Sequence, residues 1–310
     1  MAIKEAPPSG EREEHRPIEA VPVRHPGRWV GTVVIAVLVA MMINSLLTNP
    51  NWGWDLIGKW IFSAPIIKGV GITILLTVLA MLIGLILGVL IAIMRLSPNP
   101  VMSGSAWFFV WLFRGTPVYV QLFLWANVGA LYQNFAFGIP FGPEMFTVST
   151  KTLIPLFVAA LLGLGLNEAA YMSEIVRAGI LSVDEGQEEA ATAVGMTRMQ
   201  TLRHIVLPQA MRVIVPPTGN ETISMLKTTS LVIAIPLSTE LFFQASVIGN
   251  RLFRPFPMAI MASIWYLALT SVLMVGQYYI ERHYAKGAMR ELPPTPIQKL
   301  RSRFGHKASS

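Results

Sequence analysis

One long uncharged run limits what this chain can fold into. Gly69 to Met94 contains no charged residue and consists mostly of apolar side chains. A helix needs about 20 such residues to cross a hydrocarbon core about 30 Å thick. Trp29–Leu47 and Gly115–Pro143 are similar, and 53% of all residues are hydrophobic whereas 13% are charged. The sequence therefore predicts an all-α, polytopic integral membrane protein.

Apolar segments predict six membrane spans, at about 29–47, 69–94, 107–132, 153–178, 209–236 and 258–281. The third is expected to break at Arg114-Gly115-Thr116-Pro117, after an interfacial helix, and the fifth at Pro216-Pro217, because proline interrupts helical hydrogen bonding.

Three segments lie outside the five later spans. Residues 1–28 are rich in Pro, Glu and Arg, so we expect a disordered arm. The apolar run 29–47 is longer than a signal-peptide core of roughly 7–15 residues, and it is predicted to stay as an N-terminal span. Residues 285–310 form a basic tail, which is expected to touch anionic lipid headgroups.

The distribution of Lys and Arg predicts the orientation. The predicted exterior segments hold few of them, namely Lys59, Lys68, Lys151, Arg251 and Arg254. The two termini and the loop at about 179–207 hold many more. Because positive charges are enriched on cytoplasmic segments, both termini and this loop are expected to lie inside, in a bacterial inner membrane. The same rule accounts for the net charge of +7 without a nucleic-acid partner.

The second span carries a small residue at every fourth position, at Ala80, Gly84, Gly88 and Ala92. Such a ridge lets two helix backbones approach closely within a membrane. Chance in a chain rich in Gly and Ala is the alternative explanation.

The loop after the fourth span predicts two short helices. Asp184 with Gln187, and Thr197 with Gln200, have the spacing of capping boxes. Gly195 lies between them, where a helix end favours a left-handed residue. The loop is therefore expected to be a helix–turn–helix at the cytoplasmic surface.

The two predicted helices differ in their apolar faces. The first has small apolar residues that suit a partner's groove, namely Ala190, Ala191 and Val194. The second has larger ones that suit packing against the spans, namely Leu202, Ile205 and Val206. An amphipathic hairpin that lies on the lipid surface is the alternative.

The same loop resembles the EAA signature of ABC-importer permeases. The resemblance rests on the spacing of Glu189-Ala190-Ala191, Gly195 and Ile205-Val206-Leu207-Pro208. Neighbouring motifs resemble the polar amino-acid branch of that family; they are Gly71–Thr77, Arg114–Pro117 with Gln121, Ala170–Gly179, Pro208–Ala210, Pro216–Pro217 and Gly219–Glu221. The resemblance covers roughly 68–284. It implies that the ATPase-coupling residues are Glu189, Ala190, Ala191, Gly195, Ile205, Leu207 and Pro208.

The resemblance also implies an assembly. Two permease subunits, identical or paralogous, would pair above a dimer of cytoplasmic ABC ATPases, and an extracytoplasmic binding protein would deliver the solute. No Gly-x-x-x-x-Gly-Lys-Ser/Thr phosphate loop occurs in the sequence, so ATP–Mg is expected to be used by the partner ATPase. This chain is expected to bind no cofactor or metal and to have no catalytic residues.

Two features depart from the family pattern. The span 29–47 and its preceding arm lie outside the usual five-span core. Thr228 follows Lys227, where the family commonly has an acidic residue.

Polar residues in the fifth span predict a solute path, with candidate residues Asn220, Glu221, Lys227, Thr228 and Ser230. A charge at mid-bilayer costs at least about 2.5–3.5 kcal/mol on insertion scales, and interrupted helices that face a solute recur in transporters. Glu221 and Lys227 suit the ammonium and carboxylate of an amino acid. Pairing with neighbouring helices or a place near the membrane surface is the alternative, as it is for Asn167 and Glu168.

Two other function classes fit less well. A stand-alone secondary carrier would need ion-coupling carboxylates in several spans and no docking loop. A membrane enzyme would need convergent His, Asp, Glu or Ser/Lys groups at membrane depth. The sequence favours a permease subunit of an ATP-driven importer for a polar amino acid or related small solute.

Overall fold

The computed structural model describes residues 26–139 and 142–284, and the chain divides into two units, residues 1–52 and 53–310. In the first unit, helix α1 (Pro26–Thr48) is followed by the 3₁₀ turn η1 (Pro50–Trp52). α1 is long and apolar enough to cross a membrane. It coincides with the predicted span 29–47, while the arm and the basic tail lie largely outside the described residues.

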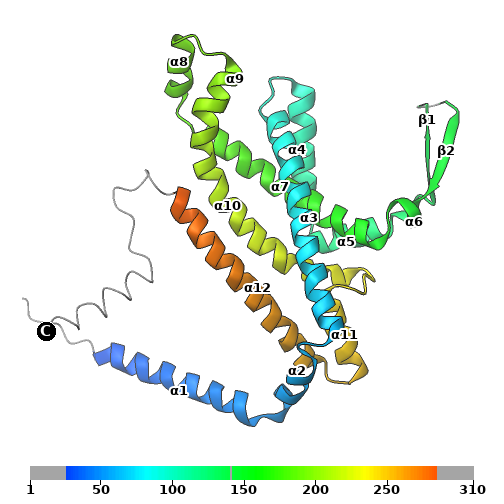
Figure 1. The fold of residues 1–310 in the computed structure, drawn as a ribbon, viewed down its shortest axis with the longest axis vertical. Helices are drawn as coiled ribbons and strands as arrows, with labels where there is room; N and C mark the ends of the chain where they lie inside the picture. The colour runs from blue at the N-terminus through cyan, green and yellow to red at the C-terminus, as the bar shows by residue number, and fades with distance from the viewer. Residues whose placement is uncertain (1–25, 140–141, 285–310) are drawn as a thin grey trace, which may run out of the picture. The chain divides into compact units, whose positions relative to one another are not determined.

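The second unit is mainly helical (Figure 1). Its elements are α2 (Trp54–Trp60), α3 (Ala64–Arg95), α4 (Pro100–Gly115), α5 (Val118–Ala126), η2 (Val128–Ala130), β1 (Asn134–Gly138), β2 (Glu144–Ser149), α6 (Thr150–Leu153), α7 (Leu156–Leu181), α8 (Glu185–Ala193), α9 (Arg198–Thr201), the π-turn η3 (Leu202–Val206), α10 (Leu207–Thr228), the 3₁₀ turn η4 (Thr229–Ala234), α11 (Leu241–Arg251) and α12 (Pro255–Tyr284).

α3 and α7 pack closely through the predicted small-residue ridge. All four ridge residues are buried. A Cβ atom on Gly84 would lie 2.4 Å from Cγ of Glu168, and one on Gly88 would lie 2.6 Å from Cβ of Met172. Only glycine permits this approach, so the prediction of a packing ridge is confirmed.

The predicted spans agree best where the apolar runs are continuous. Within the described part of the chain, α1, α3, α7 and α12 are long and apolar enough to cross a membrane. The predicted break in the third span, 107–132, is confirmed, because α4 ends at Gly115 and α5 is a separate short helix, although α4 already begins at Pro100. The break expected at Pro216-Pro217 is wrong, because α10 continues through both prolines. Extended backbone at Thr116 follows from the proline after it. The count of six spans stays a prediction.

A β-hairpin is the addition that the all-α prediction missed. β1 and β2 pair antiparallel, with Asn134 opposite Ser149 and an irregularity at Gly138. The rings of Phe137 and Phe146 stack with centroids 5.0 Å apart. The hairpin lies between the predicted spans 107–132 and 153–178, where no regular structure was predicted.

Glu240 connects α3, α11 and α12 at the end of the unit where α2 and α11 lie. Its side chain is fully buried and accepts hydrogen bonds from Thr73 Oγ1 of α3 at 3.0 Å and from Tyr266 Oη of α12 at 2.6 Å. It also caps α11 by accepting from the backbone N–H groups of Phe242 and Phe243, at 2.8 and 3.1 Å. All four bonds join one carboxylate, so this junction fixes where α11 begins.

Candidate functional site: the α8–α9 loop and the polar face of α10

The first helix of the loop, α8, is closed at both ends. Asp184 accepts a hydrogen bond from the Gly186 backbone N–H at 2.8 Å, so it caps the helix alone, without the reciprocal Gln187 bond of the predicted box. At the other end Gly195 has a φ of 82°. The Met196 N–H bonds to the Ala191 carbonyl at 3.0 Å, which is a Schellman end. The left-handed glycine is confirmed.

The second helix, α9, carries a complete capping box. The Thr197 N–H donates to Gln200 Oε1 at 2.8 Å, and the Gln200 N–H donates to Thr197 Oγ1 at 3.4 Å. The π-turn η3 follows and leads directly into α10. Such turns occur frequently at functional sites, and no residue pattern predicted this one.

The loop is held by two buried residues and leaves others exposed. Ala191 is 4% exposed and Val206 is 3% exposed. Val206 packs in a cluster with Ala92, Val176, Val183, Ala210 and Ile214. Ala191 therefore faces inward, and its predicted place on the partner-facing side is wrong. Ile205 is half-buried, whereas Leu202 is 42% exposed.

The exposed side of the loop contains most of the residues of the motif, namely Glu189, Ala190, Gly195, Leu207 and Pro208. Val194 is 76% exposed beside them. The loop lies at the end of the unit opposite α2 and α11 (Figure 1). Small, uncovered side chains on a short, capped helix leave the surface open to a partner.

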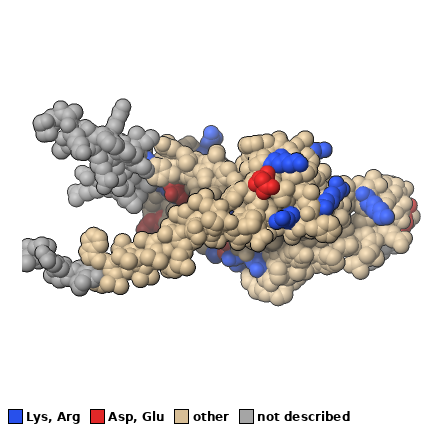
Figure 2. Space-filling model, turned by 90° about the horizontal axis from the view of Figure 1, so that it is seen from below, with Lys and Arg blue, Asp and Glu red and all other residues tan. Residues whose placement is uncertain are grey.

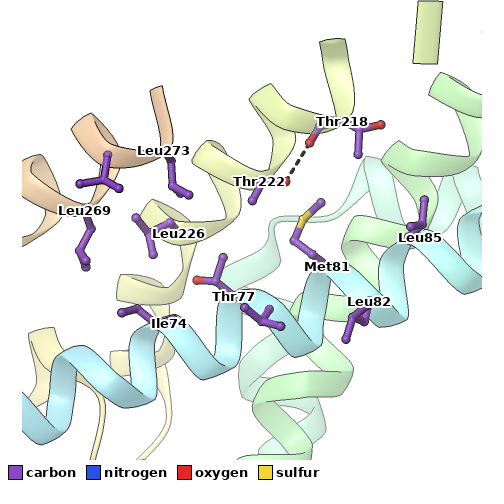
Figure 3. Close-up of a pocket in the computed structure, with 12 residues that line it drawn as sticks. Ile74, Thr77, Met81, Leu82, Leu85, Thr218, Thr222, Leu226, Leu269 and Leu273 are labelled. Atoms are coloured by element: carbon purple, nitrogen blue, oxygen red, sulfur yellow. Dashed lines mark hydrogen bonds between the residues drawn. The ribbon is translucent and has the colours of Figure 1, made fainter. Parts of the chain in front are cut away.

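One face of α10 is apolar. Thr218, Thr222 and Leu226 line a cavity of about 460 Å³ together with side chains of α3 and α12 (Figure 3). Thr222 Oγ1 donates to the Thr218 carbonyl at 2.9 Å, so this hydroxyl is satisfied within its own helix. The cavity has no charged lining residue, so it offers no partner to a zwitterion.

The opposite face of α10 is polar and exposed, with Asn220, Ser224 and Lys227. The Lys227 ammonium makes no hydrogen bond or ion pair with any described residue. Thr228 and Ser230 donate to carbonyls of the same turn, at 3.0 and 2.7 Å. Lys227 and Glu221 form no ion pair with each other, and their joint role at a zwitterion site stays a prediction.

Glu221 instead faces charges from other helices. It interacts electrostatically with Glu168 of α7 and with Arg114 of α4. Glu168 is 3% exposed, and its Oε1 atom has no hydrogen-bond partner in the described structure. Asn167 is used differently, because its Nδ2 donates to the Phe113 carbonyl at 2.9 Å and so supports the end of α4.

A charged cluster beside Arg114 was not predicted as a site. Glu174 binds Arg177 at 2.7 Å and lies 3.6 Å from Arg95. The Arg114 guanidinium lies 5.0 Å from the centroid of the Tyr171 ring. A cavity of about 450 Å³ is lined by Arg95, Arg114, Tyr171 and Glu174. The sequence could have indicated this cluster, because its charged residues lie in segments that are otherwise apolar.

Comparison with known proteins identifies the family. The model of the binding-protein-dependent transport system inner membrane component matches residues 84–286. The chain belongs to this family.

Relatives agree with the assignment. This permease is 49% identical to the arginine transport system permease ArgU of Corynebacterium glutamicum, over 94% of this chain and 91% of that protein. It is 38% identical to the L-cystine transport system permease TcyB of Bacillus subtilis, over 74% of this chain and 90% of that protein. Among solved structures, an amino acid ABC transporter is 34% identical, with a TM-score of 0.60, and the match covers 71% of this chain and 94% of that one.

The protein is therefore a membrane permease subunit of an amino-acid ABC importer. ATP hydrolysis belongs to a separate ATPase. The comparisons give no support to a stand-alone secondary carrier. The MetNI methionine transporter, at 17% identity and a TM-score of 0.55, shares the fold.

Proposed function

We propose that this permease passes a cationic amino acid, arginine or a close chemical relative, across the inner membrane. The arginine permease of C. glutamicum carries this proposal, because its similarity extends over 94% of this chain. By comparison, the matches to the L-cystine permease and to the probable amino-acid permease YckA of B. subtilis cover only 74% and 71% of this chain. The shared region with ArgU thus includes most of the N-terminal segment that departs from the five-span pattern.

The charges at membrane depth support a cationic solute. Glu221 of α10 and Glu168 of α7 supply two carboxyl groups, and Oε1 of the buried Glu168 makes no hydrogen bond within the described residues. A guanidinium has five N–H donors and suits carboxylates in this way. The remaining candidates lie along α10, at Asn220, Lys227 and Thr228, and in the η4 turn that follows it, at Ser230. A permeating solute would pass there, between two permease subunits.

The α8–α9 loop is proposed as the ATPase docking site. Its exposed residues Glu189, Ala190 and Gly195, with Leu207 and Pro208 at the start of α10, would contact a groove in the cytoplasmic ATPase. Ala191 and Ile205 would hold the loop from within. A movement of the loop would reach α10 directly through η3, because the two elements are continuous.

The assembly and orientation follow from the same reasoning. Two permease subunits, identical or paralogous, would sit on two ATPases that use ATP–Mg. A binding protein outside the membrane would deliver the solute. The loop and both termini would face the cytoplasm, since the positive charges favour that side.

Uptake by the reconstituted importer tests the proposal. The permease, its ATPase and its binding protein in liposomes should accumulate labelled arginine when ATP is supplied on the ATPase side. Unlabelled lysine or ornithine should compete, and glutamate should not. Glu221→Gln and Lys227→Ala should each alter uptake or the solute-independent ATPase rate. Accumulation of an acidic or apolar amino acid instead of arginine would refute the proposed solute class.

A further inference from the structure

The turn between α11 and α12 displays an aromatic side chain on a strained backbone. Phe253 has a φ of 53°, and its side chain is 91% exposed. Glycine adopts this conformation freely, whereas for a bulky residue it is an outlier. The turn itself is held by backbone bonds, from Phe253 N–H to the Asn250 carbonyl at 3.2 Å and from Arg254 N–H to the Gly249 carbonyl at 2.8 Å. The phenylalanine ring therefore stabilises neither the turn nor the core.

Residues with a strained backbone are concentrated at functional sites. Here the use is at the surface, because the ring is almost wholly uncovered. Exposed aromatic and arginine side chains are the residues that contribute most to protein–protein binding. Arg251 and Arg254 stand on either side of Phe253 and give the turn that composition.

The charge of this end of the molecule is one-sided. Lys59 of α2 and Lys68 of α3 add to the two arginines, and none of the four forms an ion pair with a described residue. The acidic residues in α2, α11 and the turns around them are Asp55, which is exposed, and Glu240, which is buried. Figure 2 views the molecule from this end and shows Lys and Arg side chains on its surface. A partner with an acidic surface would complement it.

A hollow adjoins the turn. It has a volume of about 540 Å³ and is lined by Trp60, Phe243, Gln244 and Arg251, among others. Leu252, directly before Phe253, is also part of its wall. Aromatic walls with an amide and a guanidinium suit one protruding side chain of a partner. Because Leu252 belongs to the wall, the protruding Phe253 ring lies next to this hollow.

We propose that the Phe253 turn and this hollow form the docking surface for the solute-binding protein, and that the binding protein meets it with an acidic rim. This inference rests on the proposed function, which places this end of the permease outside the cytoplasm. Lipid headgroups would also neutralise the arginines. The hollow favours a protein, because a lipid phosphate needs only the charges and not an aromatic-walled recess.

The test uses the reconstituted importer and varies the concentration of the arginine-loaded binding protein. The concentration that gives half-maximal ATPase stimulation should rise at least about tenfold for Phe253→Gly, as loss of one aromatic hot spot predicts. Phe253→Gly removes the backbone strain, so its melting temperature should not fall. Arg251→Glu combined with Arg254→Glu should raise the same concentration and flatten its dependence on salt. Lys151→Glu, an exposed cation of α6, is the matched control and should behave as wild type.

The outcomes distinguish a failure of the proposed docking surface from a failure of the proposed transport function. Unchanged half-saturation in both variants, with normal arginine uptake, overturns the docking surface and leaves the importer intact. An effect that appears in vesicles of anionic lipid and is absent in zwitterionic ones assigns the turn to lipid and also overturns it. Absence of arginine uptake by the wild-type importer refutes the proposed solute, whatever the variants do.

Discussion

Replacing Glu240 tests whether one carboxylate sets the geometry of the α11 end. The side chain is fully buried and accepts four hydrogen bonds, from Thr73, Phe242, Phe243 and Tyr266. Glu240→Ala leaves all four donors without this acceptor. Glu240→Gln keeps the shape and one oxygen, and its amide can donate to the two hydroxyl groups in place of accepting from them.

The expected magnitudes differ between the two variants. A buried donor without an acceptor costs about 1–3 kcal/mol, so four of them amount to roughly 4–12 kcal/mol when water does not replace the acceptor. In Glu240→Gln the bonds lose their charge assistance, which roughly halves their strength, but a buried charge is also removed. The loss should then be about 1–2 kcal/mol, near that of one or two ordinary hydrogen bonds.

Thermal unfolding of the purified permease in detergent measures the effect. The expected order of melting temperatures is wild type, then Glu240→Gln, then Glu240→Ala, with the last variant poorly folded. Thr73→Val and Tyr266→Phe each remove one donor and should fall between wild type and Glu240→Ala. An unaltered melting temperature in Glu240→Ala would refute the view that the junction holds α3, α11 and α12 together.

Further predictions concern packing and the loop. Gly88→Val should lower the melting temperature, because the added groups meet Met172 and overpacking typically costs about 1–3 kcal/mol; an unchanged melting curve would contradict the close α3–α7 approach. Gly195→Val should weaken co-purification with the ATPase, since a left-handed backbone costs a branched residue roughly 1–2 kcal/mol, whereas Gly195→Asn should be milder; equal recovery of both would count against the left-handed turn as a requirement. Thr197→Ala removes the side chain that caps α9 and should increase hydrogen exchange there by the equivalent of about 0.5–2 kcal/mol, leaving exchange in α12 unchanged.

Local patterns with a direct steric or hydrogen-bonding cause could be predicted from the sequence. The ridge around Gly84 and Gly88, the left-handed Gly195 and the Thr197–Gln200 cap all depend on residues close in the chain. The family resemblance then predicted the permease fold, because its motifs are distributed over several helices. These are the features in which local chemistry and tertiary structure agree.

Features that depend on neighbours far along the chain were missed or misplaced. The inward face of Ala191 is set by how α8 packs on the unit. The hairpin at 134–149 is local, but it lies between two predicted spans, where no regular structure was predicted. Glu221 was paired with Lys227 because both lie on one helix, yet its charged neighbours, Glu168 and Arg114, come from α7 and α4. Periodicity shows which residues share a helix face and leaves open which helix that face meets.

The α8–α9 loop is proposed to couple a separate ATPase to import through this permease. The direct measurement is simultaneous arginine uptake and ATP hydrolysis in liposomes for wild type and Ala190→Trp, with Lys151→Trp as a control at an exposed position of α6. Ala190 is exposed, so the added ring should leave folding intact and obstruct the docked ATPase. We expect Ala190→Trp to lose both uptake and the hydrolysis that the binding protein stimulates, at an unchanged melting temperature, while the control retains both. Full coupled uptake by Ala190→Trp would contradict it.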